Sequence, residues 1–143
     1  MLEFTPPQRL VKKVFLHCSA SDNINHDDVS VIRDWHVNHN GWSDVGYHFF
    51  VKSTGEIQEG RDLEMTPAAQ APYNTGTIAI CTHGLTYFSP ESMQAVYDLC
   101  QAINHAYDGR VTFHGHCEVS NKTCPVYDYK GLLGLDKNGY MQL

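Results

Sequence analysis

The sequence has little positive charge, no long apolar run and no even set of cysteines. Ten basic residues stand against 16 acidic ones, a formal net charge of −6, so we expect neither a nucleic-acid-binding surface nor a basic membrane-binding surface. No apolar run approaches the ~18 residues that a membrane-spanning helix needs. Residues 1–7 lack the basic start and apolar core of a signal peptide. These absences predict a chain that is synthesised in the cytoplasm.

The five cysteines are an odd number, which does not suggest a disulfide framework. Free thiols without a signal peptide are typical of a reducing compartment. Residues 121–123 match the acceptor pattern for N-glycosylation, and in a chain that is not secreted we interpret this match as accidental. A length of 143 residues with 42% hydrophobic content is sufficient for one core, so we expect one domain over residues 1–143.

The hydrophobic pattern alternates between strand-like and helix-like segments. Residues 61–75 lack periodicity and contain two prolines, which predicts a covering loop that forms a wall of a groove. This order predicts an α/β domain in which helices flank a central mixed β-sheet. The expected strands are 10–18, 47–52, 56–60, 77–81 and 111–114. The expected helices are 29–39 and 89–107, and a short closing helix or turn is expected at 128–135.

The segment 114–125, HGHCEVSNKTCP, carries the most chemistry in the chain. It contains two imidazoles, two thiols and one ammonium group, a mixture that a core does not need. A loop that returns Cys124 toward His116 would place a nitrogen and a sulfur ligand at one point, a pairing that zinc favours. Side chains alternate along a strand, so we expect His114 and His116 to share one face with Thr112. His114 and Cys117 offer the same ligand types, so the segment alone leaves the choice of ligands open.

A third ligand is expected at the end of the first strand. His17 closes the apolar run Val-Phe-Leu before the polar stretch Cys-Ser-Ala-Ser. Active-site groups of open α/β sheets usually lie where a buried strand meets solvent. His17, His116 and Cys124 would together leave the fourth zinc position open, as in catalytic rather than structural zinc sites.

The other histidines receive structural interpretations. His36 and His39 are one helical turn apart, but no carboxylate or cysteine accompanies them, so we expect one half-buried and one solvated ring. His83 follows a buried strand and has no partner in the sequence that would make it catalytic. We expect Cys81 and Cys100 to pack as small apolar groups.

Four segments resemble a known family: VFLHCSAS, GWSDVGYHFFV, YNTGTIAIC and HGHCEVSNKTCP. In this order they are similar to the type 2 zinc-dependent N-acetylmuramoyl-L-alanine amidases, which include small phage lysozymes and peptidoglycan recognition proteins. The resemblance places the zinc ligands at His17, His116 and Cys124, and the catalytic pair at Tyr47 and Lys122. It leaves His114 and Cys117 outside the ligand set, with His114 as a group that supports a ligand.

The resemblance implies hydrolysis of the amide between N-acetylmuramic acid and L-alanine in peptidoglycan, with Zn²⁺ as the cofactor. The expected setting is a monomeric phage endolysin that is made in the host cytoplasm and acts on the cell wall after release. The rival setting is a bacterial enzyme that recycles wall fragments. A module that binds muropeptides without cleavage is the main alternative function, although relatives of that kind typically lack the zinc cysteine. Some phage lysozymes of this type also bind and inhibit a phage RNA polymerase, which makes that polymerase a further possible partner.

Overall fold

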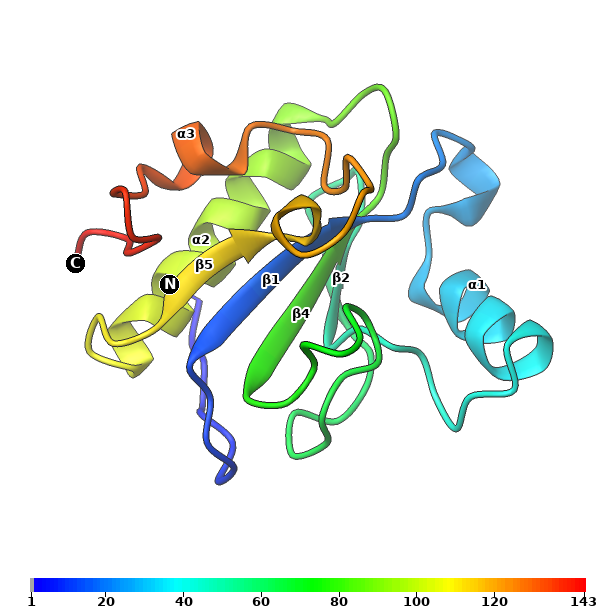
Figure 1. The fold of residues 1–143 in the computed structure, drawn as a ribbon. Helices are drawn as coiled ribbons and strands as arrows, with labels where there is room; N and C mark the ends of the chain where they lie inside the picture. Colours follow the sequence, from blue (N-terminus) through cyan, green and yellow to red (C-terminus); the bar gives the residue numbers. More distant parts are fainter. Residues whose placement is uncertain (1) are drawn as a thin grey trace.

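The computed structural model describes residues 2–143 as one mixed sheet with helices on both faces (Figure 1). The five strands lie in the order β3-β2-β4-β1-β5, and only β3 runs antiparallel to its neighbour. The α/β class and the mixed sheet predicted from the sequence are therefore confirmed. The strands are β1 (Lys13–Cys18), β2 (Phe49–Val51), β3 (Ile57–Glu59), β4 (Thr77–Thr82) and β5 (Thr112–Gly115).

The helices also follow the predicted segments. Ser89 caps α2 by accepting a hydrogen bond from the backbone of Ser92, and Pro90 occupies the first helical position. Asp28 caps α1 in the same way, through the N–H of Ser30. The helical segments are η1 (Ile24–His26), α1 (Val29–Asp34), the π-helical turn η2 (Trp35–His39), α2 (Pro90–Ala106), η3 (His116–Glu118) and α3 (Tyr129–Leu133).

Two apolar clusters fill the two faces of the sheet. The larger cluster joins α2 and α3 to one face and includes Val14 and Leu16 of β1. The smaller cluster packs α1 against Phe50 of β2 and Cys81 of β4 on the other face. Because strand side chains alternate, Phe15 and His17 point away from the larger cluster. The polar end of β1 therefore emerges on the face that α1 covers only in part.

Two of the expected element boundaries are wrong by a few residues. The first strand begins at Lys13 rather than at residue 10, and Leu10 is 70% exposed. Strand β2 begins at Phe49, so Tyr47 lies in the loop before the strand rather than at its first position. The hydrogen bond from the backbone of Arg61 to the carbonyl of Tyr47 continues the pairing beyond the strand and holds this loop against the sheet.

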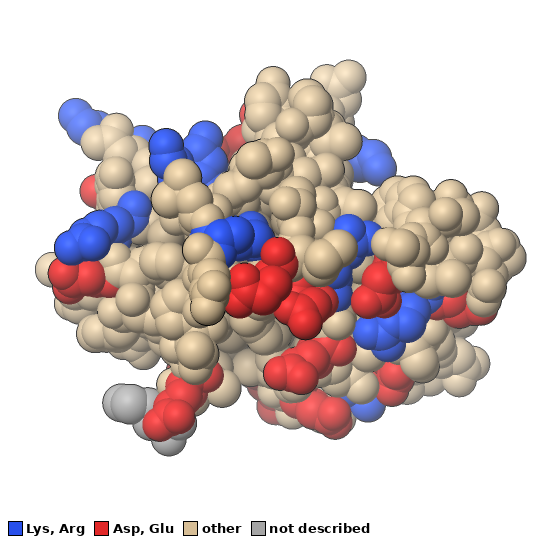
Figure 2. Space-filling view, turned by 90° about the horizontal axis from the view of Figure 1, so that it is seen from below, with Lys and Arg blue, Asp and Glu red and all other residues tan. Residues whose placement is uncertain are grey.

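Charges of both signs are interspersed on the face seen in Figure 2. That face shows no extended basic stripe among its described residues, which agrees with the acidic balance of the sequence. No helix in residues 2–143 is sufficiently long and apolar to cross a membrane.

Candidate metal centre

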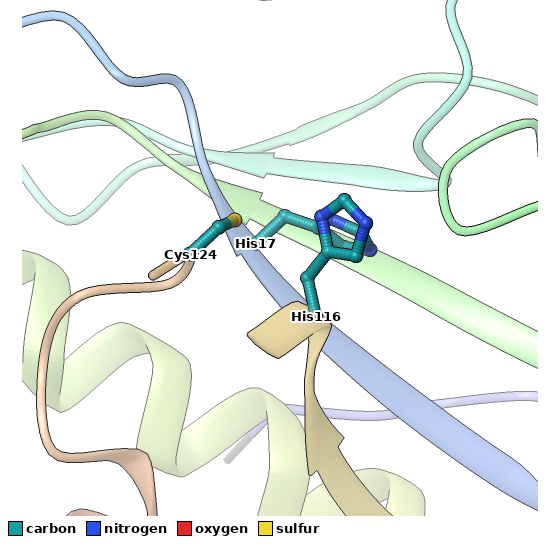
Figure 3. Close-up of side chains that lie close together, drawn as sticks. All are labelled: His17, His116 and Cys124. Atoms are coloured by element: carbon teal, nitrogen blue, oxygen red, sulfur yellow. The ribbon is translucent and has the colours of Figure 1, made fainter. Parts of the chain in front are cut away.

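Three side chains from separate parts of the chain converge at the end of β1 (Figure 3). His17 is the penultimate residue of β1, His116 follows β5, and Cys124 lies on the loop after η3. Strands β1 and β5 are parallel neighbours, so their carboxyl ends bring the two histidines to the same edge of the sheet. One ligand atom from each residue lies within 4.8 Å of the others. These are the three residues that the sequence predicted as metal ligands.

The donor set fits a zinc ion. His17 is 1% exposed, and its Nδ1 has no hydrogen-bond partner, although its Nε2 lies 2.9 Å from Oε1 of Gln70. Burial, together with His116 and Lys122, lowers the pKa of His17 to about 3. Burial and Lys122 also lower the pKa of His116. Both rings are therefore neutral at pH 7 and can offer a lone pair to a metal. The ligand atoms are sufficiently close to one another for a zinc ion between them to form bonds of about 2.0–2.3 Å.

Cys124 lies in a site that holds its sulfur in place. The backbone N–H of Cys18 donates to the Cys124 Sγ over 3.1 Å. The hydrogen bond with the Cys18 thiol and burial raise the pKa of Cys124. This thiol is therefore protonated at neutral pH without a metal, and any metal that bound here would have to displace the proton.

Tyr47 lies beside the three ligands without belonging to them. Its ring centroid is 5.1 Å from that of His17 and 5.6 Å from that of His36. Burial, with the Cys81 and Cys124 thiols nearby, raises the pKa of Tyr47 well above its ordinary value. The phenol is consequently protonated across the neutral range and can donate a hydrogen bond but cannot act as a phenolate base.

Lys122 is exposed on the loop that carries Cys124. Its positive charge is sufficiently close to lower the pKa of both His17 and His116. The loop is held by a 2.7 Å hydrogen bond from the backbone of Cys117 to the carbonyl of Cys124. The ammonium group therefore stands near the metal centre but in contact with solvent, where it is free to meet a ligand.

His114 makes its hydrogen bonds to residues other than the three candidate ligands. Its Nδ1 lies 2.9 Å from Oε1 of Glu118, and its Nε2 lies 2.7 Å from the Thr112 hydroxyl. The chain enters the turn η3 at His116, so the strand alternation that would place both histidines on one face ends before His116. Cys117 is exposed and lies outside the cluster of three.

Three other histidines, His36, His39 and His83, have structural surroundings. His36 accepts a hydrogen bond at Nδ1 from the backbone of Gly46, and His39 is exposed. His83 is 6% exposed and lies 3.8 Å from the buried carboxylate of Asp27. Of the described residues, these three histidines do not join the metal cluster.

Gln70 is the site residue that sequence reasoning missed. It lies in the predicted covering loop and is 1% exposed, with its side chain against His17. A glutamine in an aperiodic loop gives no motif, and only the length of that loop hinted at a role.

Comparisons with known proteins identify the family of this chain. The family described as N-acetylmuramoyl-L-alanine amidase matches residues 7–127. The endolysin of Escherichia phage T7 is 37% identical over 126 residues, which cover 82% of each chain. The endolysin of Enterobacteria phage T3 is 33% identical over 132 residues, 87% of this chain and 86% of the relative.

Solved structures share the fold at lower identity. The amidase LysC of Clostridium intestinale superposes with a TM-score of 0.77 at 21% identity, over 93% of each chain. The endolysin of the Thermus scotoductus phage Ph2119 superposes with a TM-score of 0.76 at 24% identity, over 94% of this chain and 87% of the other. The arrangement of sheet and helices is thus shared across these proteins.

Proposed function

The chain belongs to the N-acetylmuramoyl-L-alanine amidase family, and from this premise we propose how its residues carry out the reaction. The protein is a cell-wall amidase: it hydrolyses the amide between N-acetylmuramic acid and L-alanine in peptidoglycan. We take residues 1–143 as one catalytic domain. The observation that carries the mechanism is the convergence of two neutral imidazoles and one thiol at the end of β1.

The cofactor in this proposal is zinc, held by His17, His116 and Cys124. Zinc bound with one open position supplies a Lewis acid for the scissile carbonyl and lowers the pKa of water. The unpaired Nδ1 of His17 supports this assignment, because a buried ring nitrogen without a partner is costly unless it binds something. The N–H of Cys18 supports the thiolate form of Cys124 that a metal requires.

Lys122 is proposed to stabilise negative charge on the reacting carbonyl oxygen. Amide hydrolysis passes through a tetrahedral oxyanion, and a preorganised donor at that oxygen contributes about 2.7–4 kcal/mol. The electrostatic influence of Lys122 on both histidines supports its closeness to the reaction. Since the side chain is exposed, its ammonium group can move to meet the substrate.

Tyr47 is proposed to orient the attacking water or to pass a proton toward the leaving amine. The raised pKa of its phenol keeps the donor form at neutral pH. Its ring packs beside His17, so the hydroxyl group has a defined position relative to the metal centre.

The biological setting proposed here is that of a phage endolysin, made in the host cytoplasm and acting on peptidoglycan after release. The two phage endolysins described above support it, since the similarity covers most of each chain. A monomeric state and an interaction with a phage RNA polymerase stay predictions of the family resemblance.

Metal content of ligand variants tests the proposed centre. The purified protein should hold about one zinc per chain, and His17→Ala, His116→Ala and Cys124→Ser should lose it together with amidase activity. His36→Ala is the matched control and should keep both, because its ring bonds the backbone of Gly46 and lies outside the cluster. Full activity after complete removal of metal would refute the zinc mechanism.

A further inference from the structure

Gln70 lies in the middle of a chain of hydrogen bonds that runs from His17 through Gln70 and Thr77 to the carbonyl of Asn74. The Oε1 of Gln70 lies 2.9 Å from Nε2 of His17, and its Nε2 donates to the Thr77 hydroxyl over 2.8 Å and to the Tyr73 carbonyl over 3.2 Å. The Thr77 hydroxyl in turn donates to the carbonyl of Asn74 over 2.7 Å. Both His17 and Gln70 are 1% exposed. Water therefore has little access to the bond between His17 and Gln70 or to the bond between Gln70 and Thr77.

The backbone carbonyls at the far end determine the direction of every bond in this chain. A carbonyl oxygen only accepts, so the hydroxyl of Thr77 must donate to Asn74 and must accept from Gln70. The end of the Gln70 side chain that faces Tyr73 and Thr77 is therefore its NH₂ group. Its oxygen must then face His17, where it can only accept a hydrogen bond.

We infer that Gln70 is a positioning residue for the metal centre: it holds His17 in the tautomer with the proton on Nε2. In that tautomer the ring donates from Nε2 to Gln70 and leaves a bare lone pair on Nδ1. Nδ1 is the buried ring atom without a protein partner, on a residue of the metal cluster. In the opposite tautomer the lone pair on Nε2 of His17 would face the lone pairs on Oε1 of Gln70, and Nδ1 would carry a proton and could not bind the metal.

Residues of β4 and of the covering loop hold the Gln70 side chain next to His17. Thr77 and Cys81 share a face of β4, and Cys81 is paired in register with His17, so Thr77 and His17 lie on the same side of the sheet. The Asn74 side chain accepts hydrogen bonds from the backbone N–H groups of Ala69 and Gln70. In this inference the covering loop holds the side-chain oxygen of Gln70 next to Nε2 of His17.

The inference rests on the metal site proposed above, but its first test needs no metal. Long-range ¹H–¹⁵N correlation spectra of the metal-free protein report which nitrogen of His17 carries the proton. The unmodified protein should show a bare Nδ1 and a protonated Nε2. Gln70→Met, which keeps the length of the side chain but loses the acceptor, should show a mixture of tautomers. A protonated Nδ1 in the unmodified protein would overturn the inference even if no variant folds.

The second test is zinc affinity, measured by competition with a chromophoric chelator at one fixed pH. Gln70→Met should bind zinc about 10–100-fold more weakly than the unmodified protein, the usual effect of losing a group that orients a ligand. Gln70→Glu again offers an oxygen to Nε2 but loses the donations to Tyr73 and Thr77, so it should bind zinc more tightly than Gln70→Met and more weakly than the unmodified protein. Asn104→Leu, which removes another fully buried amide from α2, should leave zinc affinity unchanged.

The outcomes separate this inference from the proposed function. If the unmodified protein bound no zinc, the metal centre would be refuted, while the tautomer spectra would still decide the role of Gln70. If zinc bound equally well to the unmodified protein and to Gln70→Met, with identical His17 spectra, the metal centre would stand and the role of Gln70 would be refuted.

Discussion

The buried ring of His48, which is not one of the proposed metal ligands, should make the free energy of unfolding depend on pH. The Nδ1 of His48 accepts a hydrogen bond from the backbone N–H of Ala79 over 3.1 Å, and its Nε2 lies 2.8 Å from the carbonyl of Met65. A proton on Nδ1 would face the N–H of Ala79 and break that bond. Burial, with Arg9 and Arg61 nearby, lowers the pKa of His48 to about 4.

The sign and size of the effect follow from the two pKa values. Unfolded His48 binds a proton near pH 6.5, whereas the folded protein does so only near pH 4. Between these values the unfolded state holds the extra proton, so the free energy of unfolding falls as the pH is lowered. The slope approaches about 1.4 kcal/mol per pH unit, and the stabilisation lost by pH 4 is about 3 kcal/mol.

Urea unfolding at several pH values, in chelator to exclude metal effects, measures this contribution against a matched variant. His48→Asn keeps an oxygen near the position of Nδ1 to accept from Ala79, but it does not titrate. His48→Asn should cost about 1 kcal/mol at pH 7 through the lost bond to Met65. It should then lose less stability than the unmodified protein between pH 6.5 and 4. Parallel pH profiles for the two proteins would refute the reasoning.

Other predictions concern the reaction and the choice of ligands. Lys122→Ala should reduce kcat about 10²–10³-fold, and Tyr47→Phe should reduce it roughly 10²–10⁴-fold. Both variants should keep their folding, zinc content and affinity for muropeptides. Near-normal turnover in these variants would refute the proposed roles. His114→Ala should keep about one zinc per chain by metal analysis and lose about 1–3 kcal/mol of stability in urea unfolding, because its bonds to Thr112 and Glu118 are structural. Loss of zinc in His114→Ala but not in His116→Ala would show that this ligand is assigned two residues out of place.

The elements of the fold follow from local patterns, but their arrangement does not. Apolar runs and a turn at Gly55 indicate the strands, and Ser89 with Pro90 marks the start of α2. The order of strands depends on pairing between distant segments, such as β1 with β4 and β5, which no local pattern encodes. Strand alternation also fails at the end of β5, because η3 begins there and rotates His116 out of the expected register.

The candidate site shows the same division. His17, His116 and Cys124 stand out because their residue types are rare together and their segments match a family pattern. Gln70 does not stand out, because its proposed role depends on how the loop of residues 61–75 folds. The sequence of that loop has no periodicity from which its course could be predicted. A carboxamide becomes significant only when the carbonyls of Tyr73 and Asn74 determine which of its ends faces His17.

Mass analysis of purified peptidoglycan after digestion tests the central claim most directly. The unmodified, zinc-loaded protein should release free peptides that begin with L-alanine and leave glycan strands of unchanged length. Cys124→Ser should release none of these peptides, because its metal ligand is lost. Shortened glycan strands, peptides cleaved within the stem, or binding of muropeptides without any cleavage would each contradict a zinc amidase centred on His17, His116 and Cys124.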